Sequence, residues 1–255
     1  VMIQEFCMGG TFKDYLDAHP KNTKVIKNIL FQILYTICVL QYQLPGFRHN
    51  DLHNKNVMLQ VLPPSKKSGH FEYHIGGKIF YLPSYGIQAK IIDFDTTCSD
   101  KYPNQKISLD KVYFRNGVIC QNNAVFDTHL FLNSCFYSFF KKSLGKSMYD
   151  TIVGNKFNTV LSKELEDFIT RNIPMKYLGF NSNTLGYARI KDPSYKVIDG
   201  ELKTPLELIL GDSLFQDFLT KPSQSKKLDK YHSGIPSLSK IDAKTRQSII
   251  SESYN

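Results

Sequence analysis

Apolar residues recur at helical spacing in the first part of the chain. From Asn22 to Gln43 they follow the i, i+3, i+4 pattern of a helix that is buried along one face, and Leu44-Pro45-Gly46 predicts its end. A shorter helix is predicted from Thr11 to His19. The longest apolar run, Ile29 to Leu40, contains polar residues and is too short to span a bilayer, so we interpret it as part of a core helix.

Further along the chain, the pattern predicts three more helices. One begins within residues 125–134, where a strongly apolar run contains a single early acid, and another occupies residues 161–173 and ends before Pro174. A third begins at Thr204 and Pro205, because threonine is a good N-cap and proline is favoured at the first helical position. The chain is therefore predicted to be mainly helical.

Strands are predicted where β-branched or alternating residues occur. Residues 57–62 form one apolar run, and a second ends in Ile91-Ile92-Asp93, which we interpret as a buried strand carrying a carboxylate at its end. Residues 71–82 alternate about Gly76-Gly77, the pattern of a hairpin. The glycines and the lysine after them lack the other residues of a phosphate-binding loop, so the turn is favoured. We expect this hairpin to be an insertion over residues 63–86 on the protein surface.

Composition limits the number of domains and the type of site. With 255 residues and 42% hydrophobic content, the chain can bury one large core, or one core with a tail. The five cysteines include no C-x-x-C pair, which argues against a zinc site or a disulfide framework and favours an intracellular, reducing compartment. No signal-peptide pattern opens the chain, and it starts at Val1, so we interpret the sequence as truncated.

The formal net charge of +9 is concentrated partly near the C-terminus. Residues 221–255 contain seven basic and three acidic residues, a net of +4, together with several serines, and we expect this tail to be mostly disordered. No RNP-type motif or zinc finger accompanies the charge, so specific nucleic-acid binding is not expected. Attraction to acidic substrates or membrane surfaces stays open.

The candidate chemistry lies in a polar stretch that includes His49, Asp51 and Asn56. These residues have the H-x-D-x-x-x-x-N spacing of a phosphotransferase catalytic loop. In such a loop the aspartate can face an attacking hydroxyl while the asparagine faces a metal ion on the nucleotide phosphates. Asp93, at the end of its predicted strand, is the natural second metal ligand. Taken alone, the motif could also be a polar loop with a solvated aspartate.

These motifs, together with the strand, glycine break and helix start of residues 1–16, make the chain resemble a eukaryotic-type protein kinase. The resemblance covers the C-terminal lobe from the hinge onward, an α+β, mainly helical domain that we place at residues 1–220. It implies a hinge at residues 1–10 and an activation segment at residues 93–124.

The resemblance also implies ATP and Mg²⁺ as cofactors and assigns roles to further residues. Glu5 and Cys7 would offer hinge backbone groups to the adenine, and Asn56 and Asp93 would hold the metal. Asp127 would pin the loop through backbone N–H groups, with His49 as structural support. The alternative for Asp127 is an acid at a helix N-terminus that is stabilised by the helix dipole.

Several residues depart from the family pattern. Asn50 replaces an arginine common in protein kinases, which puts control through a phosphorylated activation segment in doubt. His53 replaces the lysine usual in serine/threonine kinases. A histidine at this position is similar to the pattern of haspin-type kinases and of aminoglycoside and choline phosphotransferases. Asp95 replaces the glycine of D-F-G, which removes an easy left-handed backbone position. No A-P-E triplet precedes Asp127. Overall the chain is most similar to kinases of large DNA viruses, which would act in the host cytoplasm or the virion.

We therefore expect a viral serine/threonine protein kinase that acts on a protein substrate, with Asp51, His53 and Asn56 in catalysis. A small-molecule kinase of the aminoglycoside or choline type is one alternative, favoured by His53 and Asp95. A non-catalytic pseudokinase scaffold is another, disfavoured because the motif acids and Asn56 are intact. Since the family's glycine-rich loop and strand lysine lie before the hinge, the chain alone is expected to transfer no phosphate.

Overall fold

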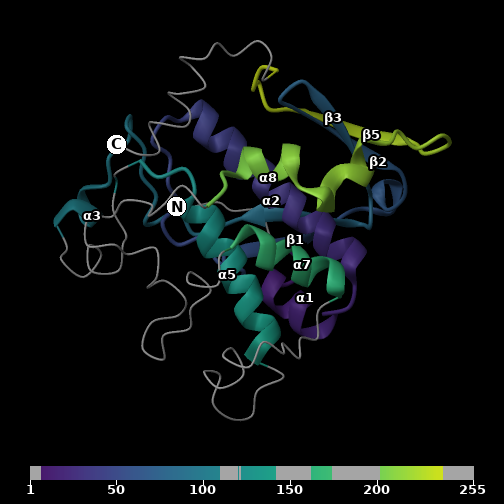
Figure 1. Cartoon of the computed structure of the whole chain (residues 1–255), viewed down its shortest axis with the longest axis horizontal. Coiled ribbons are helices and arrows are strands. Elements are labelled where there is room, and N and C mark those ends of the chain that lie inside the picture. The colour runs from purple at the N-terminus through teal and green to yellow at the C-terminus, as the bar shows by residue number, and fades with distance from the viewer. Residues whose placement is uncertain (1–6, 110–119, 121, 142–161, 174–201, 238–255) are drawn as a thin grey trace.

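The computed structural model describes residues 7–109, 120, 122–141, 162–173 and 202–237. In these ranges, helices and two small β-sheets surround one long helix, α2 (Thr23–Gln43) (Figure 1). This mixture of elements fits the expected α+β, kinase-like fold. The predicted hinge residues 1–6 and tail residues 238–255 lie outside the described ranges.

The first helix, α1 (Phe12–Ala18), begins where the sequence predicts. The Thr11 hydroxyl accepts a hydrogen bond from the Asp14 backbone N–H (3.1 Å), and the Asp14 carboxylate accepts one from the Thr11 N–H (3.2 Å). These reciprocal bonds satisfy N–H groups that have no partner inside the helix. The Phe12 ring then packs against Phe131 of α5 (Phe126–Lys141), with ring centroids 6.1 Å apart.

Helix α2 passes through the centre of the protein and carries much of the core. It contacts α5, α7 (Lys163–Asn172), α8 (Pro205–Gly211) and the 3-10 helix η3 (Ser213–Leu219). Among the described residues, it alone is long and apolar enough to cross a membrane, but most of it is buried within the protein. The prediction that its apolar stretch forms a core helix agrees with this burial.

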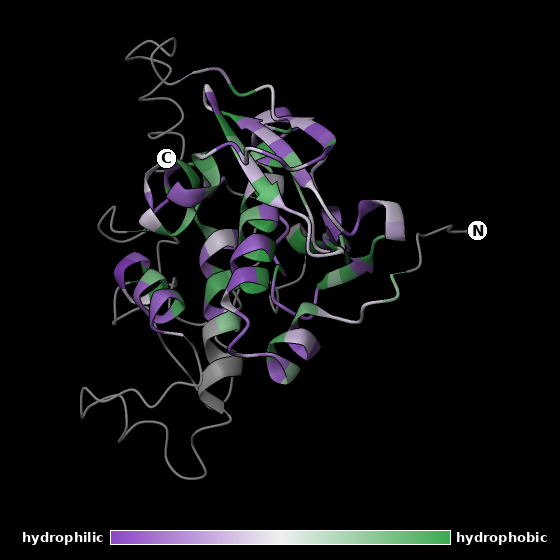
Figure 2. Ribbon diagram, turned by 90° about the vertical axis from the view of Figure 1, so that its right-hand side faces the viewer, coloured by the Kyte–Doolittle hydropathy of each residue, from purple (hydrophilic) through white to green (hydrophobic). Residues whose placement is uncertain are grey.

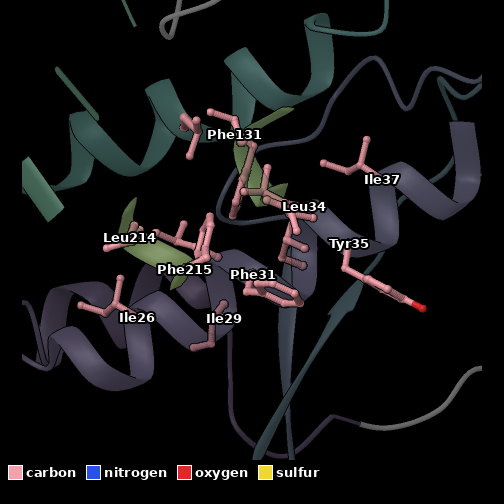
Figure 3. Close-up of a cluster of buried hydrophobic side chains, with 14 of the residues drawn as sticks. Ile26, Ile29, Phe31, Leu34, Tyr35, Ile37, Phe131, Leu214 and Phe215 are labelled. Carbon is pink, nitrogen blue, oxygen red and sulfur yellow. The ribbon is translucent and has the colours of Figure 1, made fainter. Parts of the chain in front are cut away.

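Aromatic side chains from α2, η3 and the larger sheet meet at Phe31. Figure 3 shows Phe31 of α2 and Phe215 of η3 side by side. Five aromatic rings lie with centroids 5.0 to 6.4 Å from that of Phe31, and four are in edge-to-face or tilted arrangements that aromatic pairs favour. We call this group the aromatic cluster: Phe31, Tyr35, Tyr73, Phe80, Phe215 and Phe218.

The smaller sheet contains two antiparallel strands, β1 (Val57–Val61) and β4 (Ile87–Ile91), with Val57 opposite Ile91. A strand is present before Asp93, as predicted. The prediction that this strand is buried is wrong, because every residue of β4 is only half-buried. One side of β4 contacts α2, where Gln32 accepts a hydrogen bond from the Ala89 N–H (2.9 Å). A two-stranded sheet covered on one side leaves its β-branched residues partly exposed.

The predicted hairpin is present as β2 (His70–Ile75) and β3 (Lys78–Pro83), preceded by the 3-10 turn η1 (Pro64–Lys66). Gly76 and Gly77 have φ of 58° and 81°, which glycine adopts without a Cβ penalty and which a two-residue hairpin turn requires. The hairpin is more than a surface insertion, since its inward residues join the main core. They are Phe71, Tyr73, Ile75, Phe80 and Leu82.

Part of the expected disordered tail forms a strand, so that prediction is wrong for Lys227–His232. This segment, β5, pairs in parallel with β2 and completes a three-stranded sheet (Figure 1, upper right). Its Tyr231 ring stacks on Tyr73 with centroids 4.7 Å apart. Ion pairs also hold it: Lys227 with Glu72 (2.7 Å) and Lys66 with Asp229 (2.6 Å). Because β5 mixes charged side chains with Leu228 and Tyr231, its sequence resembles a solvated tail. In Figure 2, hydrophilic and hydrophobic residues likewise alternate along the strands of the sheets.

The helices after α5 are tied to α2 by charged side chains. Lys27 of α2 is buried, and its Nζ lies 2.7 Å from Asp217 and 3.3 Å from Glu164. Helix α8 begins at Thr204, which forms the predicted N-cap with Glu207. The predicted helix at residues 161–173 is observed as α7.

Candidate functional site

The segment between α2 and β1, which we call the 47–56 loop, is deeply buried at its start. Residues 47–50 are each at most 4% exposed. Arg48 pairs with Cys98 as in an antiparallel ladder, since the Arg48 N–H donates to the Cys98 carbonyl (2.8 Å) and the Cys98 N–H donates back (2.9 Å). The sequence before Asp51 is therefore fixed against the segment that follows Asp93.

Asp127, in the first turn of α5, fixes the backbone of this loop. Its two carboxylate oxygens accept hydrogen bonds from the backbone N–H groups of His49 (2.8 Å) and Asn50 (2.9 Å), and its side chain is fully buried. Bonds of this kind to a charged acceptor are stronger than neutral ones. These contacts are the ones expected of Asp127 on resemblance, and they go beyond the helix-dipole alternative.

Asn50 connects the loop to the segment after Asp93. Its φ is 67°, a left-handed conformation that asparagine tolerates better than most residues. Its side-chain amide donates to the Thr96 carbonyl (3.0 Å) and to the Cys98 sulfur (3.3 Å), while the Thr96 hydroxyl donates to the His49 carbonyl (3.0 Å). The segment is thus held next to the loop by neutral groups, at the position where many kinases have an arginine.

Arg48 is a supporting residue that the sequence analysis did not identify. Its side chain is 1% exposed, and its guanidinium carbon lies 4.0 Å from the centroid of the Phe126 ring, a cation–π contact. Burial lowers the Arg48 pKa, and the nearby Asp127 opposes this shift. An arginine beside a histidine in a polar stretch gives no sign of such burial, because its aromatic partner is distant in sequence.

Asp51 and Asn56 are directly connected, as the spacing of the motif suggests. The Asn56 amide nitrogen donates to the Asp51 backbone carbonyl (2.9 Å) and to its carboxylate (3.1 Å). The Asn56 side chain is buried, and because its amide nitrogen is engaged by Asp51, its carbonyl oxygen is the atom that could bind a metal ion. The Asp51 side chain is 33% exposed, so its carboxylate can be reached from solvent.

His53 lies beside Asp51, with Nε2 at 3.7 Å from the aspartate Oδ1. Its Nδ1 accepts a hydrogen bond from the Lys55 N–H (3.2 Å), so the neutral ring carries its proton on Nε2, facing Asp51. Desolvation lowers the His53 pKa, and the charges of Asp51 and Asp93 oppose this shift. The structure thus places a neutral N–H donor at the site near pH 7.

Asp93 is brought to the 47–56 loop by contacts of its neighbours. The Ile92 N–H donates to the Asn56 carbonyl (3.0 Å), the Ile92 carbonyl lies 3.0 Å from His49 Nε2, and the Phe94 ring packs against the His49 ring. Asp93 itself has φ of 65° and an exposed side chain. The left-handed residue in this D-F-D sequence is therefore Asp93, and Asp95 needs no such conformation.

Asn54 is a further residue that the motif did not predict to matter. Its backbone and side-chain N–H groups donate to the Ser134 hydroxyl and carbonyl of α5 (2.9 Å each), and its carbonyl accepts from Lys13 of α1 (3.1 Å). The far end of the loop is thus fastened to the same helix that carries Asp127.

The described part of the predicted hinge lies against β1. The Gly9 N–H donates to the Leu59 carbonyl (2.8 Å), and a Cβ on Gly9 would lie 2.5 Å from that oxygen, so only glycine fits. Cys7 is half-buried just before this contact. Glu5, the other residue expected to face the adenine, lies outside the described residues.

The donor set suits Mg²⁺ bound together with phosphate. In the described ranges, no group of three or more histidine, cysteine, aspartate or glutamate residues is arranged to hold a metal ion. Magnesium in nucleotide sites is usually held by one or two carboxylates and by phosphate oxygens, so it needs no such group. The Asn56 amide oxygen and the exposed Asp93 carboxylate are oxygen ligands of the required kind.

Comparison with known proteins agrees with this geometry. The chain is 28% identical over 226 residues to a protein of Acanthamoeba polyphaga mimivirus named "Putative serine/threonine-protein kinase", covering 86% of this chain and 44% of the relative. A second mimivirus protein of the same name is 27% identical over 218 residues, covering 82% of this chain and 51% of the relative. Mouse serine/threonine-protein kinase haspin is 33% identical over 95 residues, covering 36% of this chain and 12% of haspin.

The chain thus spans about half the length of the mimivirus relatives. No protein-family model matches it. The matches to the viral proteins cover most of the chain, and the shorter match to haspin names the same class of enzyme. The chain therefore contains a kinase-like domain related to viral serine/threonine-protein kinases.

Proposed function

We propose that this chain is the catalytic lobe of a protein kinase that transfers the γ-phosphate of Mg-ATP to serine or threonine hydroxyls of a protein. The observation that carries the proposal is the contact between Asp51 and Asn56 in a loop whose backbone is pinned by Asp127. A solvated polar loop would have no need of a fully buried carboxylate beneath it.

In the proposed mechanism, Asp51 orients the attacking hydroxyl and accepts its proton. The carboxylate suits this role because it is accessible and is held in one orientation by the Asn56 amide. Asn56 and Asp93 would hold Mg²⁺, which when bound would supply positive charge that offsets the charge of the nucleotide phosphates. The bonds from Ile92 to Asn56 and His49 keep these two ligands in register.

His53 is proposed to assist as a hydrogen-bond donor. Its Nε2–H faces Asp51, and its lowered pKa keeps it neutral, so it does not supply the fixed charge that a lysine would. A donor at this place can stabilise negative charge that develops on the transferred group.

The alternative of a small-molecule kinase has less support. His53 and Asp95 favour it, but the two mimivirus relatives and mouse haspin are named as serine/threonine-protein kinases. A scaffold without activity is also less favoured, because Asp51, Asn56 and Asp93 are present and Asn56 donates a hydrogen bond to the Asp51 carboxylate.

The test is a kinase assay on the full-length protein that contains this chain, with Mg-ATP and a generic basic protein substrate. Asp51→Asn should lower turnover by about 10²–10⁴-fold, the range for loss of a general base, while nucleotide affinity changes little. Asp93→Asn should weaken magnesium-dependent nucleotide binding. Asp100→Asn, which changes an exposed carboxylate nearby, is the matched control and should remain active. Unchanged turnover in Asp51→Asn would contradict the proposal.

A further inference from the structure

Two cysteines meet beside the 47–56 loop. Cys120 packs against Cys98 and Ile107 in a small apolar cluster, and the neighbouring Cys120 thiol contributes to the raised pKa of Cys98. Both are free thiols in this structure. They are 22 positions apart in the sequence, so their contact joins two distant points of the predicted activation segment.

Cys98 is also connected to the candidate active site. Its backbone pairs with Arg48, and its sulfur accepts a hydrogen bond from the Asn50 amide (3.3 Å). Asn50 directly precedes Asp51, so a change at the Cys98 sulfur acts one residue from the proposed catalytic base.

The two thiols differ in access and in environment. Cys98 is 1% exposed, and burial raises its pKa to about 12, whereas the Arg48 charge and the Asn50 amide act in the opposite direction. Cys120 is half-buried, so of the two it is the more exposed to solvent. Cys120 is therefore the thiol that reacts first, and Cys98 is the buried partner that follows.

We propose that Cys98 and Cys120 form a reversible, redox-sensitive disulfide next to the catalytic loop, with a peroxide as the oxidant. The Cys120 thiol attacks hydrogen peroxide, giving a sulfenic acid and one water. The Cys98 thiol then attacks the Cys120 sulfur, forming the S–S bond and releasing a second water. The two sulfurs lose two electrons in total, and the peroxide is reduced to two waters.

The bond would constrain the site because of its length. A disulfide holds its sulfurs about 2.0 Å apart, closer than two thiols in van der Waals contact, so the two sulfurs must approach each other. Because the Cys98 sulfur also accepts a hydrogen bond from the Asn50 amide, such a shift is felt next to the 47–56 loop. Intracellular disulfides that are made and reduced again are commonly redox-sensing, which matches a pair placed at a regulatory segment.

The experiment is peptide mapping of the full-length protein after treatment with hydrogen peroxide and blocking of free thiols. Trypsin separates the two cysteines, because cleavage sites lie between them at Lys101, Lys106, Lys111 and Arg115. We expect a cross-linked pair of peptides containing Cys98 and Cys120, with a mass about 2 Da below the sum of the reduced peptides. Dithiothreitol should restore both free thiols.

Matched variants make the result specific. Cys120→Ser changes a half-buried side chain and should abolish the cross-link, whereas Cys38→Ala, which removes a buried cysteine of α2, should leave it intact. Circular dichroism checks that both variants fold. The proposal is wrong if Cys98 stays reduced in the parent protein, or if Cys120 is found only as a higher oxide or bonded to another cysteine. The measurement needs no kinase activity, so it stands apart from the test of Asp51.

Discussion

The 47–56 loop and the aromatic cluster are both buried, yet different interactions hold them. The loop is fixed by hydrogen bonds between side chains and backbone groups. Asp127 accepts from backbone N–H groups, while Asn50 and Thr96 donate to backbone carbonyls. The aromatic cluster is fixed by ring packing around Phe31, with few polar atoms. The loop presents the Asp51 carboxylate to solvent, beside the exposed Asp93 that follows β4, whereas the side chains of the cluster are buried.

This difference separates positioning from stability. Hydrogen bonds are directional, so a polar network can hold a carboxylate in one orientation, but each bond adds only about 0.5–1.5 kcal/mol of net stability. Ring packing is less directional and contributes through buried area, about 25 cal/mol per Å². Changes in the cluster should therefore unfold the protein, while changes at the loop should act first on the site.

The largest effect on stability is expected from Phe31→Ala. Phe31 is fully buried and touches five other rings, so the change leaves a cavity and should lower the free energy of unfolding by about 3–5 kcal/mol. Urea unfolding monitored by circular dichroism measures the loss. Tyr42→Ala, on an exposed position of the same helix, is the control. If the two variants were equally stable, the cluster would not be the source of stability.

Asp127→Ala tests the polar side of the comparison. Removing the carboxylate leaves the N–H groups of His49 and Asn50 buried without a partner, at a cost of about 2–4 kcal/mol in the free energy of unfolding. Turnover should fall below that of Phe31→Ala when both are assayed under conditions where they are folded. Asp100→Ala serves as the control. A stable, fully active Asp127→Ala would mean that the loop is positioned by other contacts.

Acid should destabilise the protein through His129 of α5. This residue of α5 is buried, its Nε2 lies 2.5 Å from Asn133 Nδ2, and burial lowers its pKa to about 3. An unfolded histidine has a pKa near 6.5, so the unfolded chain binds a proton that the native state does not. Stability is therefore complete above about pH 6.5 and falls as pH drops toward 3, by about 2 kcal/mol at pH 5.

The measurement is the unfolding free energy at several pH values between 5 and 7.5. His129→Gln should flatten the dependence, while His19→Gln, at an exposed position, should leave it as in the parent. His53 and His74 also have lowered pKa values, chiefly from desolvation, and contribute in the same direction. An unchanged slope in His129→Gln would assign the acid sensitivity to those residues.

The smallest effect is expected from substitution of His53, which lies beside Asp51. His53→Ala removes the N–H that faces Asp51 and should lower turnover by about tenfold, equivalent to about 1.4 kcal/mol, with little change in stability. His53→Lys supplies a positive charge at the same place and should keep activity. Full activity in His53→Ala would show that the residue is only structural.

The elements that could be predicted from sequence are those with local signals. Helix α1 has its capping box, α2 its long apolar face, and the hairpin its two glycines, so each was placed nearly at its observed bounds. Strand β5 was missed because its stability comes from Tyr73 and Glu72, which lie more than 150 positions earlier in the sequence. The burial of β4 was misjudged because apolar composition does not say how many faces of a strand are covered.

By itself, the sequence determined the candidate site, since the spacing of His49, Asp51 and Asn56 and the acid at Asp93 already identify a phosphotransferase pattern. Only the tertiary structure decided how that site is held. Asn50 and Arg48 find partners in Cys98, Asp127 and Phe126, about 50 to 80 positions away, and hydrogen bonds or ring contacts at such separations leave no periodic trace in the chain. Local periodicity fixes helices and turns, whereas burial and pairing depend on which distant surfaces meet.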